Sequence, residues 1–314
     1  MAKFIILGPL AKDKIVKNDN IYPAIGGAVY YQTAVFSRLG IDNTVITTLA
    51  EKDDDLIKDL PKDTDIIPIC TKETMEFENI YPDDNPNHRI QRAFIPNNPI
   101  NPDTISKINF KDFDAILLSP LSPSDIPLNT LKYLSQFKKP IYLGAQGYMR
   151  HTENGKVVLK PWNDYKKFLK FIKLLFLDEM EARVILGMHT DNCGEIARKL
   201  TSFGPEEVII TRGDNGALIY SRKTKFNEPL KKVNEPLNIP AFTPKEITDP
   251  TGLGDTFMAA YAAEKLESDN PEVCGIFASL VSSLKMEHKG AFQGEKILIE
   301  ERMKNYFHKK NIFE

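Results

Sequence analysis

Short, nearly continuous apolar runs alternate along this chain with longer segments whose apolar residues recur at helical spacing. Apolar runs of this kind are typical of strands buried on both faces of a parallel sheet. The runs that we predict to be strands are residues 4–7, 43–48, 115–118, 141–143, 174–177, 207–211 and 217–220. The segments that we predict to be helices are 28–39, 128–136, 163–171, 180–186, 193–201, 255–266 and 271–285. Strands separated by helices predict an α/β fold, a doubly wound and mostly parallel central sheet with helices on both faces.

A region near residues 75–95 departs from this rhythm. Residues 75–81 and 88–95 read as two strands joined by the turn-rich segment 82–87, Pro-Asp-Asp-Asn-Pro-Asn, which predicts a hairpin. A small sheet inserted early in an α/β chain indicates a lid over a ligand site, although the same pattern also fits a plain surface hairpin. We therefore expect one domain over residues 1–314, with a β-sheet lid formed by about 11–25 and 71–96.

Charge and cysteine content narrow the class of protein. The 314 residues carry 41 Lys and Arg against 43 Asp and Glu, without a long run of either sign, which argues against a dedicated nucleic-acid or membrane-surface role. Three cysteines lie far apart and form no Cys-x-x-Cys pair, so we expect no disulfide framework and no zinc site, and a reducing cytoplasm is the simplest location. No apolar run reaches membrane-spanning length, and the apolar start at residues 3–8 is too short for a signal peptide.

The strongest candidate for chemistry is a glycine-rich turn that runs into a predicted helix. Residues 249–255 read Asp-Pro-Thr-Gly-Leu-Gly-Asp, and an Ala-rich segment with good helix propensity follows. A turn at a helix N-terminus presents free backbone N–H groups that attract anions, and glycines let the backbone approach a phosphate closely. Asp255 would stand beside that anion and could take a proton from an attacking hydroxyl. The turn therefore indicates a phosphoryl-transfer site; an ordinary tight turn with an acidic first helical residue is the alternative.

Three further segments accompany this turn. Residues 26–40 begin with Gly-Gly and end with Arg-Leu-Gly, residues 177–182 read Leu-Asp-Glu-Met-Glu-Ala, and residues 211–216 read Thr-Arg-Gly-Asp-Asn-Gly. Together with 249–255, in this order, they resemble the signatures of the ribokinase-like (PfkB) family of carbohydrate kinases, and the resemblance extends over most of the chain. The segment 144–150, Gly-Ala-Gln-Gly-Tyr-Met-Arg, follows a predicted strand and is more similar to the myo-inositol-kinase-like branch than to ribokinase itself.

The resemblance implies an activity and assigns catalytic residues. Such kinases move the γ-phosphoryl group of ATP to a hydroxyl of a small sugar or polyol. Asp255 would be the catalytic base, and the backbone N–H groups of Gly252, Leu253 and Gly254 would form the anion hole. The family usually has Ala where this chain has Leu253, but either residue supplies the same N–H group. The chain has no Gly-x-x-x-x-Gly-Lys-Ser/Thr motif, so a Walker-type ATP site is not expected.

Metal ions follow from the same resemblance. Glu181 would hold Mg²⁺ through water, and Asp178, which replaces the family's Asn, could strengthen that hold. A solvated first turn of a helix is the alternative for this acidic pair. Many relatives bind K⁺ beside the anion hole through an aspartate at the position of Asp249, so K⁺ is a further candidate cofactor.

The substrate-binding residues are also implied by position. On the acceptor side they are Asp13, Gly26, Gly27, Tyr31, Gln146 and Arg150. Tyr31 stands where many sugar kinases have an Asn, which suggests a different acceptor, with more ring-stacking area. On the ATP side they are Thr211, Gly213, Gly216, Ala278, Ser282 and Gly290, of which the apolar members could equally belong to the core.

The acceptor stays open at this point. A sugar or cyclic polyol is expected, with myo-inositol as the leading candidate, and a nucleoside is the alternative because Tyr31, Phe77, Tyr81 and Phe94 could stack on a base. A sensor protein that kept the fold and lost turnover is a rival from another class. A nicotinamide-dependent oxidoreductase is disfavoured, because Gly-Pro-Leu-Ala at residues 8–11 replaces the expected Gly-x-Gly-x-x-Gly. Relatives often pair through their lids, so a homodimer is a further expectation.

Overall fold

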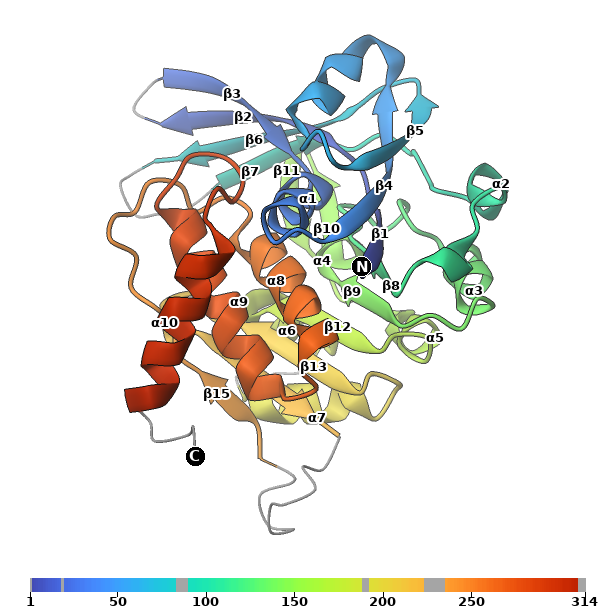
Figure 1. Ribbon diagram of the computed structural model, residues 1–314. Helices are drawn as coiled ribbons and strands as arrows, with labels where there is room; N and C mark the ends of the chain where they lie inside the picture. The colour runs from blue at the N-terminus through green and yellow to red at the C-terminus, as the bar shows by residue number, and fades with distance from the viewer. Residues whose placement is uncertain (1, 18–19, 83–89, 188–191, 223–234, 310–314) are drawn as a thin grey trace.

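The computed structural model describes residues 2–17, 20–82, 90–187, 192–222 and 235–309. Within these ranges nine strands form one central sheet (Figure 1), in which β1, β4, β5, β8, β9, β12 and β13 are parallel and β14 and β15 run antiparallel to their neighbours. All seven predicted strands are present. From edge to edge the order is β15 (Leu237–Ile239), β14 (Ala217–Ser221), β13 (Glu207–Thr211), β12 (Leu174–Asp178), β9 (Ile141–Gly144), β8 (Ala115–Leu118), β1 (Lys3–Leu7), β4 (Asp42–Ala50) and β5 (Asp65–Thr71).

Two hydrophobic cores cover the two faces of this sheet. Along β1, Phe4 and Ile6 belong to one core and Ile5 and Leu7 to the other, as the alternation of side chains in a strand requires. The first core is closed by α1 (Ala28–Arg38), α8 (Leu253–Glu267), α9 (Pro271–Met286) and α10 (Lys296–Lys309). The second is closed by α2 (Pro102–Ile105), α3 (Leu128–Ser135), α5 (Tyr165–Leu169), α6 (Glu179–Ile185) and α7 (Cys193–Thr201). The predicted α/β fold with helices on both faces is therefore confirmed.

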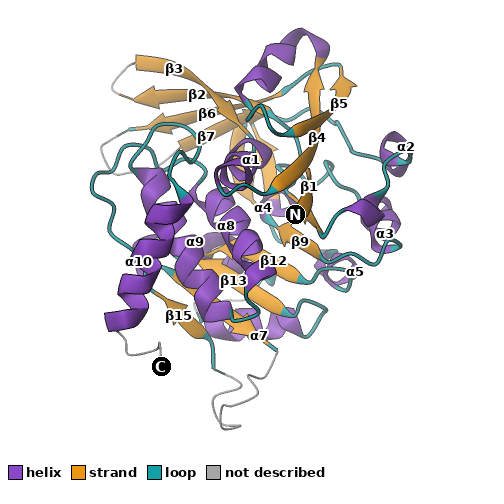
Figure 2. Cartoon of the chain, viewed as in Figure 1, coloured by secondary structure: helices purple, strands orange, loops and turns teal. Residues whose placement is uncertain are grey.

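A second sheet projects from the central one (Figure 2). The predicted hairpin is present as two antiparallel strands, although residues 83–89, which include its turn and the expected start of its second strand, lie outside the described residues. In the described residues the sheet contains β10 (Arg150–Glu153), β11 (Lys156–Leu159), β7 (Ile90–Phe94), β6 (Met75–Tyr81), β2 (Ala11–Lys17) and β3 (Asn20–Gly26), in that order.

The hairpin of β10 and β11 was not predicted. Its two strands pair across Asn154 and Gly155, which adopt φ angles of 50° and 75°. Asn-Gly at the two central positions of a tight turn is a strong hairpin signal, so the sequence held the information. This hairpin brings Arg150, the last residue of the predicted site segment 144–150, into the second sheet.

Other elements differ from the predictions in extent. The helix expected at 163–171 spans only Tyr165–Leu169, because the chain turns before it, where the Tyr165 N–H donates to the Trp162 carbonyl. Edge strand β5 carries Pro68, whose missing N–H is tolerated at the edge of a sheet. Elements that were not predicted are β5, β15, α2, α10, α4 (Gln146–Met149), η1 (Glu51–Asp59), η2 (Phe110–Asp112) and η3 (Gly213–Asn215).

The structure also describes the cysteines and the lengths of the apolar helices. The cysteines Cys70, Cys193 and Cys274 are free thiols. In the part of the chain that the structure describes, no helix is both long enough and apolar enough to cross a bilayer.

Candidate active site

The site residues gather at one edge of the central sheet. The parallel strands β9, β12 and β13 end there with Gly144, Asp178 and Thr211, and Asp178 and Thr211 are directly paired in register. The chain order reverses between β1 and β8, which is the place where open α/β sheets bind ligands outside the carboxyl ends of their strands. Asp13 follows β1 on this same side, in strand β2.

The glycine-rich turn ends at the N-terminus of α8. Gly252 is the N-cap residue, with φ 73° and ψ 16° in the left-handed region that favours glycine. A Cβ on Gly252 would overlap the ring of Tyr31, whereas a Cβ on Gly254 would meet no atom within 4 Å. Leu253 and Gly254 are the first two residues of α8, whose N–H groups have no partner within the helix, and Asp255 is the third helical residue.

Hydrogen bonds brace this turn from below. Asp249 accepts from the Thr251 N–H through Oδ1 at 2.9 Å and from the Gly290 N–H through Oδ2 at 2.9 Å. The N–H of Thr248 donates to the Met286 carbonyl at 2.9 Å, which ties the turn to the end of α9. The backbone that offers N–H groups to an anion is thus fixed before any ligand arrives, as electrostatic stabilisation of phosphoryl transfer requires.

Asp249 does not have the surroundings of a K⁺ ligand. The Lys285 ammonium donates to the Asp249 carbonyl at 2.8 Å and lies 3.5 Å from Asp249 Oδ2. A second monovalent cation on the same oxygens would face this charge at close range, where the low dielectric of the interior makes repulsion strong. The residues present therefore do not fit the K⁺ that the family resemblance implied.

Asp13 begins a polar chain on the other side of the site. Its Oδ2 accepts from the Asn79 amide at 3.2 Å, and Asn79 Oδ1 accepts from the Gln91 amide at 2.8 Å. These three residues come from β2, β6 and β7 of the second sheet, and Asn79 is only 1% exposed. Gly26 packs against the first of these polar side chains, because a Cβ there would overlap the Asp13 carboxylate. Gly27, the N-cap of α1, adopts φ 101° and turns the backbone from β3 into that helix.

Tyr31 connects the two sides. It is buried, its ring lies on Gly252, and the Lys285 ammonium stands 5.5 Å from the ring centroid. Burial raises the pKa of Tyr31 well above its ordinary value, and the negative charges of Asp249, Asp13 and Asp255 raise it further. Three carboxylates, Asp13 in β2 and Asp249 and Asp255 in the turn 249–255, therefore act on this phenol, which stays protonated and able to donate a hydrogen bond.

Gln146 and Arg150 form a pair at the start of the second sheet's β10. With its amide oxygen facing the guanidinium, Gln146 accepts from Arg150 Nη1 at 3.0 Å and also from Nη2. The guanidinium carbon lies 5.5 Å from the centroid of the Phe77 ring. The positive charge of Arg150 also acts on Glu181, so Arg150 faces the acidic end of the site.

Asp178 and Glu181 form a capping box at the start of α6. Asp178 Oδ1 accepts from the Glu181 N–H at 2.7 Å, and Glu181 Oε2 accepts from the Asp178 N–H at 2.9 Å. Burial, followed by the Asp178 charge, raises the pKa of Glu181 to about 8, while Arg150 opposes this shift. The alternative of a solvated first turn is thus wrong for Glu181, because this carboxyl is buried.

This acidic pair fits a Mg²⁺ ion held through water. Within the described ranges, no three His, Cys, Asp or Glu side chains come together as a direct metal cluster. Mg²⁺ usually keeps several waters and is held by one or two carboxylates together with substrate phosphates. Asp178 and Glu181 can supply those carboxylates at the edge where the anion-binding turn also lies.

The residues predicted to bind ATP lie in three places. Thr211 ends β13, Gly213 begins η3 and Gly216 is the C-cap of η3; a Cβ on Gly213 would meet no atom within 4 Å. Gly290 is tied to Asp249, as described above. On α9, Ala278 is fully buried in the core, whereas the Ser282 hydroxyl has no hydrogen-bond partner among the described residues. Of these two, Ser282 is therefore the one with a polar group to offer.

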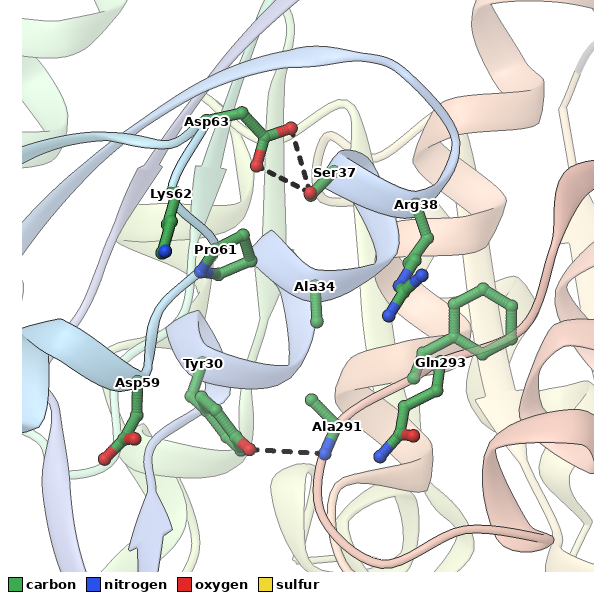
Figure 3. A pocket seen from close by; sticks show the side chains of 11 residues that line it. Tyr30, Ala34, Ser37, Arg38, Asp59, Pro61, Lys62, Asp63, Ala291 and Gln293 are labelled. Atoms are coloured by element: carbon green, nitrogen blue, oxygen red, sulfur yellow. Dashed lines mark hydrogen bonds between the residues drawn. The ribbon is translucent and has the colours of Figure 1, made fainter.

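Tyr30, the neighbour of Tyr31 on α1, packs edge-on against the Tyr31 ring with 5.1 Å between the ring centroids. It borders a pocket of about 590 Å³ between α1, the end of η1 and the loop 291–293 (Figure 3). Its hydroxyl accepts from the Ala291 N–H at 3.4 Å, and burial raises its pKa. The two neighbouring tyrosines thus hold the 290–291 loop and the Gly252 turn against the same helix.

Comparison with known proteins identifies the family. Residues 107–297 match the family described as pfkB family carbohydrate kinase, and this match covers more than half of the chain. The chain belongs to the pfkB family of carbohydrate kinases.

Individual curated relatives match only parts of this chain, at low sequence identity. Ribokinase of Arabidopsis thaliana is 25% identical over 179 residues, which are 56% of this chain and 41% of that protein. A nucleoside kinase of Methanothermobacter thermautotrophicus is 34% identical over 91 residues, 29% of this chain and 25% of that protein. The chain therefore matches less than half the length of either curated relative.

Solved structures show the ribokinase fold over nearly the whole chain. A pyrophosphate-dependent kinase of the ribokinase family, complexed with a pyrophosphate analogue and myo-inositol, has a TM-score of 0.77 at 23% identity, over 92% of this chain and 97% of that chain. Arabidopsis thaliana ribokinase, complexed with ribose and ATP, has a TM-score of 0.74 at 19% identity, over 97% and 99%.

Three residues of the site were missed by the sequence analysis. Asn79 and Gln91 complete the chain that begins at Asp13, and Lys285 lies under the turn. A signal existed for two of them. Asn79 interrupts an inward-facing apolar alternation in β6, and Lys285 falls on the buried stripe of α9 with Ala278 and Val281.

Proposed function

We propose that this chain is an ATP- and Mg²⁺-dependent phosphotransferase that moves the γ-phosphoryl group to a hydroxyl of a small sugar or cyclic polyol, with myo-inositol as the leading acceptor. The observation that carries the proposal is the braced turn at the N-terminus of α8, with Asp255 in its first turn and a buried polar chain opposite. Family membership supports the reaction type.

Different residues have different roles in the displacement at the γ-phosphorus. Asp255 accepts the proton of the attacking hydroxyl, whose oxygen forms the new bond to phosphorus while the bond from the γ-phosphorus to the leaving ADP oxygen breaks. The N–H groups of Gly252, Leu253 and Gly254 stabilise the charge on the transferred group, and Arg150 adds a positive charge near the acidic end. Mg²⁺, held through water by Asp178 and Glu181, would neutralise phosphate charge.

The acceptor side favours a polyol. Asp13 offers carboxylate oxygens, and Asn79 is placed next to it, so a ring bearing several hydroxyls would find both acceptors and donors there. A nucleoside is the second candidate, because relatives include a nucleoside kinase. The predicted stacking residue Phe77 is buried under the Arg150 guanidinium, whereas Phe94 is 48% exposed. We therefore rank a nucleoside below a polyol as the acceptor.

A substrate panel tests the proposal. Purified protein is incubated with MgATP or with magnesium pyrophosphate and with myo-inositol, ribose, other sugars or nucleosides, and ADP or phosphate release and the phosphorylated product are measured. We expect ATP-dependent phosphorylation of myo-inositol or another polyol. Turnover with pyrophosphate alone would correct the donor, preferred nucleoside turnover would correct the acceptor, and ligand binding without turnover would favour the sensor.

Two further expectations belong to this proposal. The second sheet would act as the lid over the acceptor, because Asp13 and Arg150 both come from it. Its outer strand β3 exposes Ile21 and Tyr22 at 64% and 51%, and we propose that a homodimer covers them. Light scattering of the wild type and of Tyr22→Glu checks this: a dimer that becomes monomeric is expected, and a monomeric wild type would contradict it.

A further inference from the structure

Lys285 carries its charge where no solvent reaches it. The side chain is 0% exposed, at the last turn of α9, and lysines are almost never buried in this way unless they are paired. An ammonium group has three donors. It lies 2.8 Å from the Asp249 carbonyl, 3.5 Å from Asp249 Oδ2 and 5.5 Å from the centroid of the Tyr31 ring. All three neighbours attract a positive charge; the Tyr31 ring does so through the negative potential of its face.

Each of these neighbours supports the anion-binding turn. Asp249 fixes the Thr251 and Gly290 N–H groups, and the Tyr31 ring lies on Gly252. The end of α9 also receives the Thr248 N–H at the Met286 carbonyl. One buried cation is therefore in contact with the carboxylate and the ring that hold the first residues of the anion hole in place.

The surroundings of this lysine partly offset the effect of its burial on the pKa. Burial lowers the pKa of Lys285, and the Asp249 carboxylate opposes that change. The carbonyl end of α9 favours a cation as well, because the helix dipole is negative there. A neutral amine at this place would leave the Asp249 carboxylate, which is mostly buried at 14% side-chain exposure, without its ionic partner.

We propose that Lys285 is a positioning residue whose ammonium is the resident cation of the anion-hole turn, so that phosphoryl transfer by this chain needs no monovalent metal ion. The proposal rests on the kinase function proposed above. It replaces the expected K⁺ with a covalently attached charge on the same Asp249 oxygens.

The first experiment uses the wild-type protein and needs no variant. Initial rates with the best acceptor of the panel, and melting temperatures without any acceptor, are measured in KCl and in tetramethylammonium chloride at equal ionic strength. We expect rates equal within about twofold, well below the fivefold or more that coupled sites typically give, and melting temperatures that do not change. Activation by K⁺, or a melting temperature that rises with K⁺ concentration, would show a bound metal ion and overturn the proposal.

The second experiment removes the lysine charge and then supplies a cation from solution. Lys285→Ala opens a cavity beside Asp249, and the misplaced turn should lower kcat by about a hundredfold. K⁺, NH₄⁺ or methylammonium should then restore at least about tenfold of the loss, and K⁺ should raise the melting temperature of this variant. Lys285→Met fills the space without the charge, so it should lose turnover and show no rescue. Equal turnover in Lys285→Met and wild type would contradict the proposal.

Lys265 provides a matched control. It is also buried, at 4% exposure, and donates to Glu207 at 2.8 Å, far along α8 from the turn. Lys265→Ala removes a buried ionic partner and should lose stability, but added cations should not change its kcat. Rescue of Lys265→Ala to the same extent would mean that cations act on the whole protein. If no acceptor in the panel is phosphorylated, the melting temperatures still decide the cation question, so the two proposals fail separately.

Discussion

The two sides of the candidate site are built in different ways. The donor side, the turn 249–252 with the start of α8, is made of backbone groups braced by Asp249 and Lys285. The acceptor side, Asp13 with Asn79 and Gln91, is made of side chains from three strands of the second sheet. Backbone N–H groups can bind the same phosphate in every relative, whereas side chains change with each substitution. The comparison indicates that the reaction type resides on the donor side and the choice of acceptor on the other.

The sharpest test of the donor side is the proposed base. Asp255→Asn removes the group that accepts the proton but leaves the N–H groups of α8 in place, so kcat should fall by about a hundredfold or more. Binding of MgATP and the melting temperature should stay close to the wild-type values. Steady-state kinetics, calorimetric titration and thermal unfolding measure the three quantities.

Near-wild-type turnover of Asp255→Asn at saturating substrate would remove Asp255 from the mechanism. A loss of folding would leave the fold, rather than the chemistry, as the explanation, and circular dichroism distinguishes these outcomes.

The two glycines of the turn should respond differently. Gly252→Ala places a Cβ into the Tyr31 ring at a left-handed backbone position, so the free energy of unfolding should fall by about 2 kcal/mol or more. Gly254→Ala meets no atom within 4 Å and lies in the helix, so stability should stay constant or rise by up to about 1 kcal/mol. Denaturant unfolding of both variants measures this difference.

Gly254→Ala should instead raise the KM for the phosphoryl donor, since its methyl group would occupy space beside the N–H groups. If both variants lost the same stability, the Tyr31 ring would not be the partner that makes Gly252 necessary.

The acceptor side is tested through Asn79. Asn79→Ala removes the amide that bonds to Asp13 and should change the ratio of kcat/KM between two acceptors by at least about tenfold, or about 1.4 kcal/mol. The KM for the donor should change little, because the turn is not touched. Gln91→Ala, which acts through Asn79, should shift the same ratio less. Identical ratios in wild type and Asn79→Ala would show that the acceptor is recognised elsewhere.

This division also explains what the sequence could predict. The turn 249–255 is contiguous and depends on glycine at fixed positions, so its residues could be recognised directly. The pair of Asp13 and Asn79 is separated by 66 positions, and that of Asp249 and Lys285 by 36, so each contact exists only after folding. Six of the seven parallel strands were found because they are mostly buried and rich in apolar or β-branched residues, whereas the half-exposed strand β5 and the hairpin of β10 and β11 have a weaker pattern.

The last prediction concerns pH and joins the two sides, because the charge of Arg150 acts on Glu181. Since the pKa of Glu181 is raised to about 8, this carboxyl is mostly protonated near pH 7 in the metal-free protein. Mg²⁺ binding favours the ionised form, so the apparent Mg²⁺ affinity should rise by up to about tenfold per pH unit below pH 8 and level off above it. Magnesium titrations of activity between pH 6.5 and 9 measure this dependence, with Glu181→Gln as the variant in which it should disappear.

Stability should change with pH in the opposite direction. A carboxyl whose pKa is higher in the folded state stabilises the fold at low pH, and this contribution is lost as pH rises from the ordinary value of 4.5 through about 8. The free energy of unfolding of the metal-free wild type, relative to Glu181→Gln, should therefore fall over this window by at most about 1.4 kcal/mol per pH unit. A difference that rises with pH would mean that Arg150 outweighs burial and keeps Glu181 ionised, and the Mg²⁺ affinity would then lose its pH dependence as well.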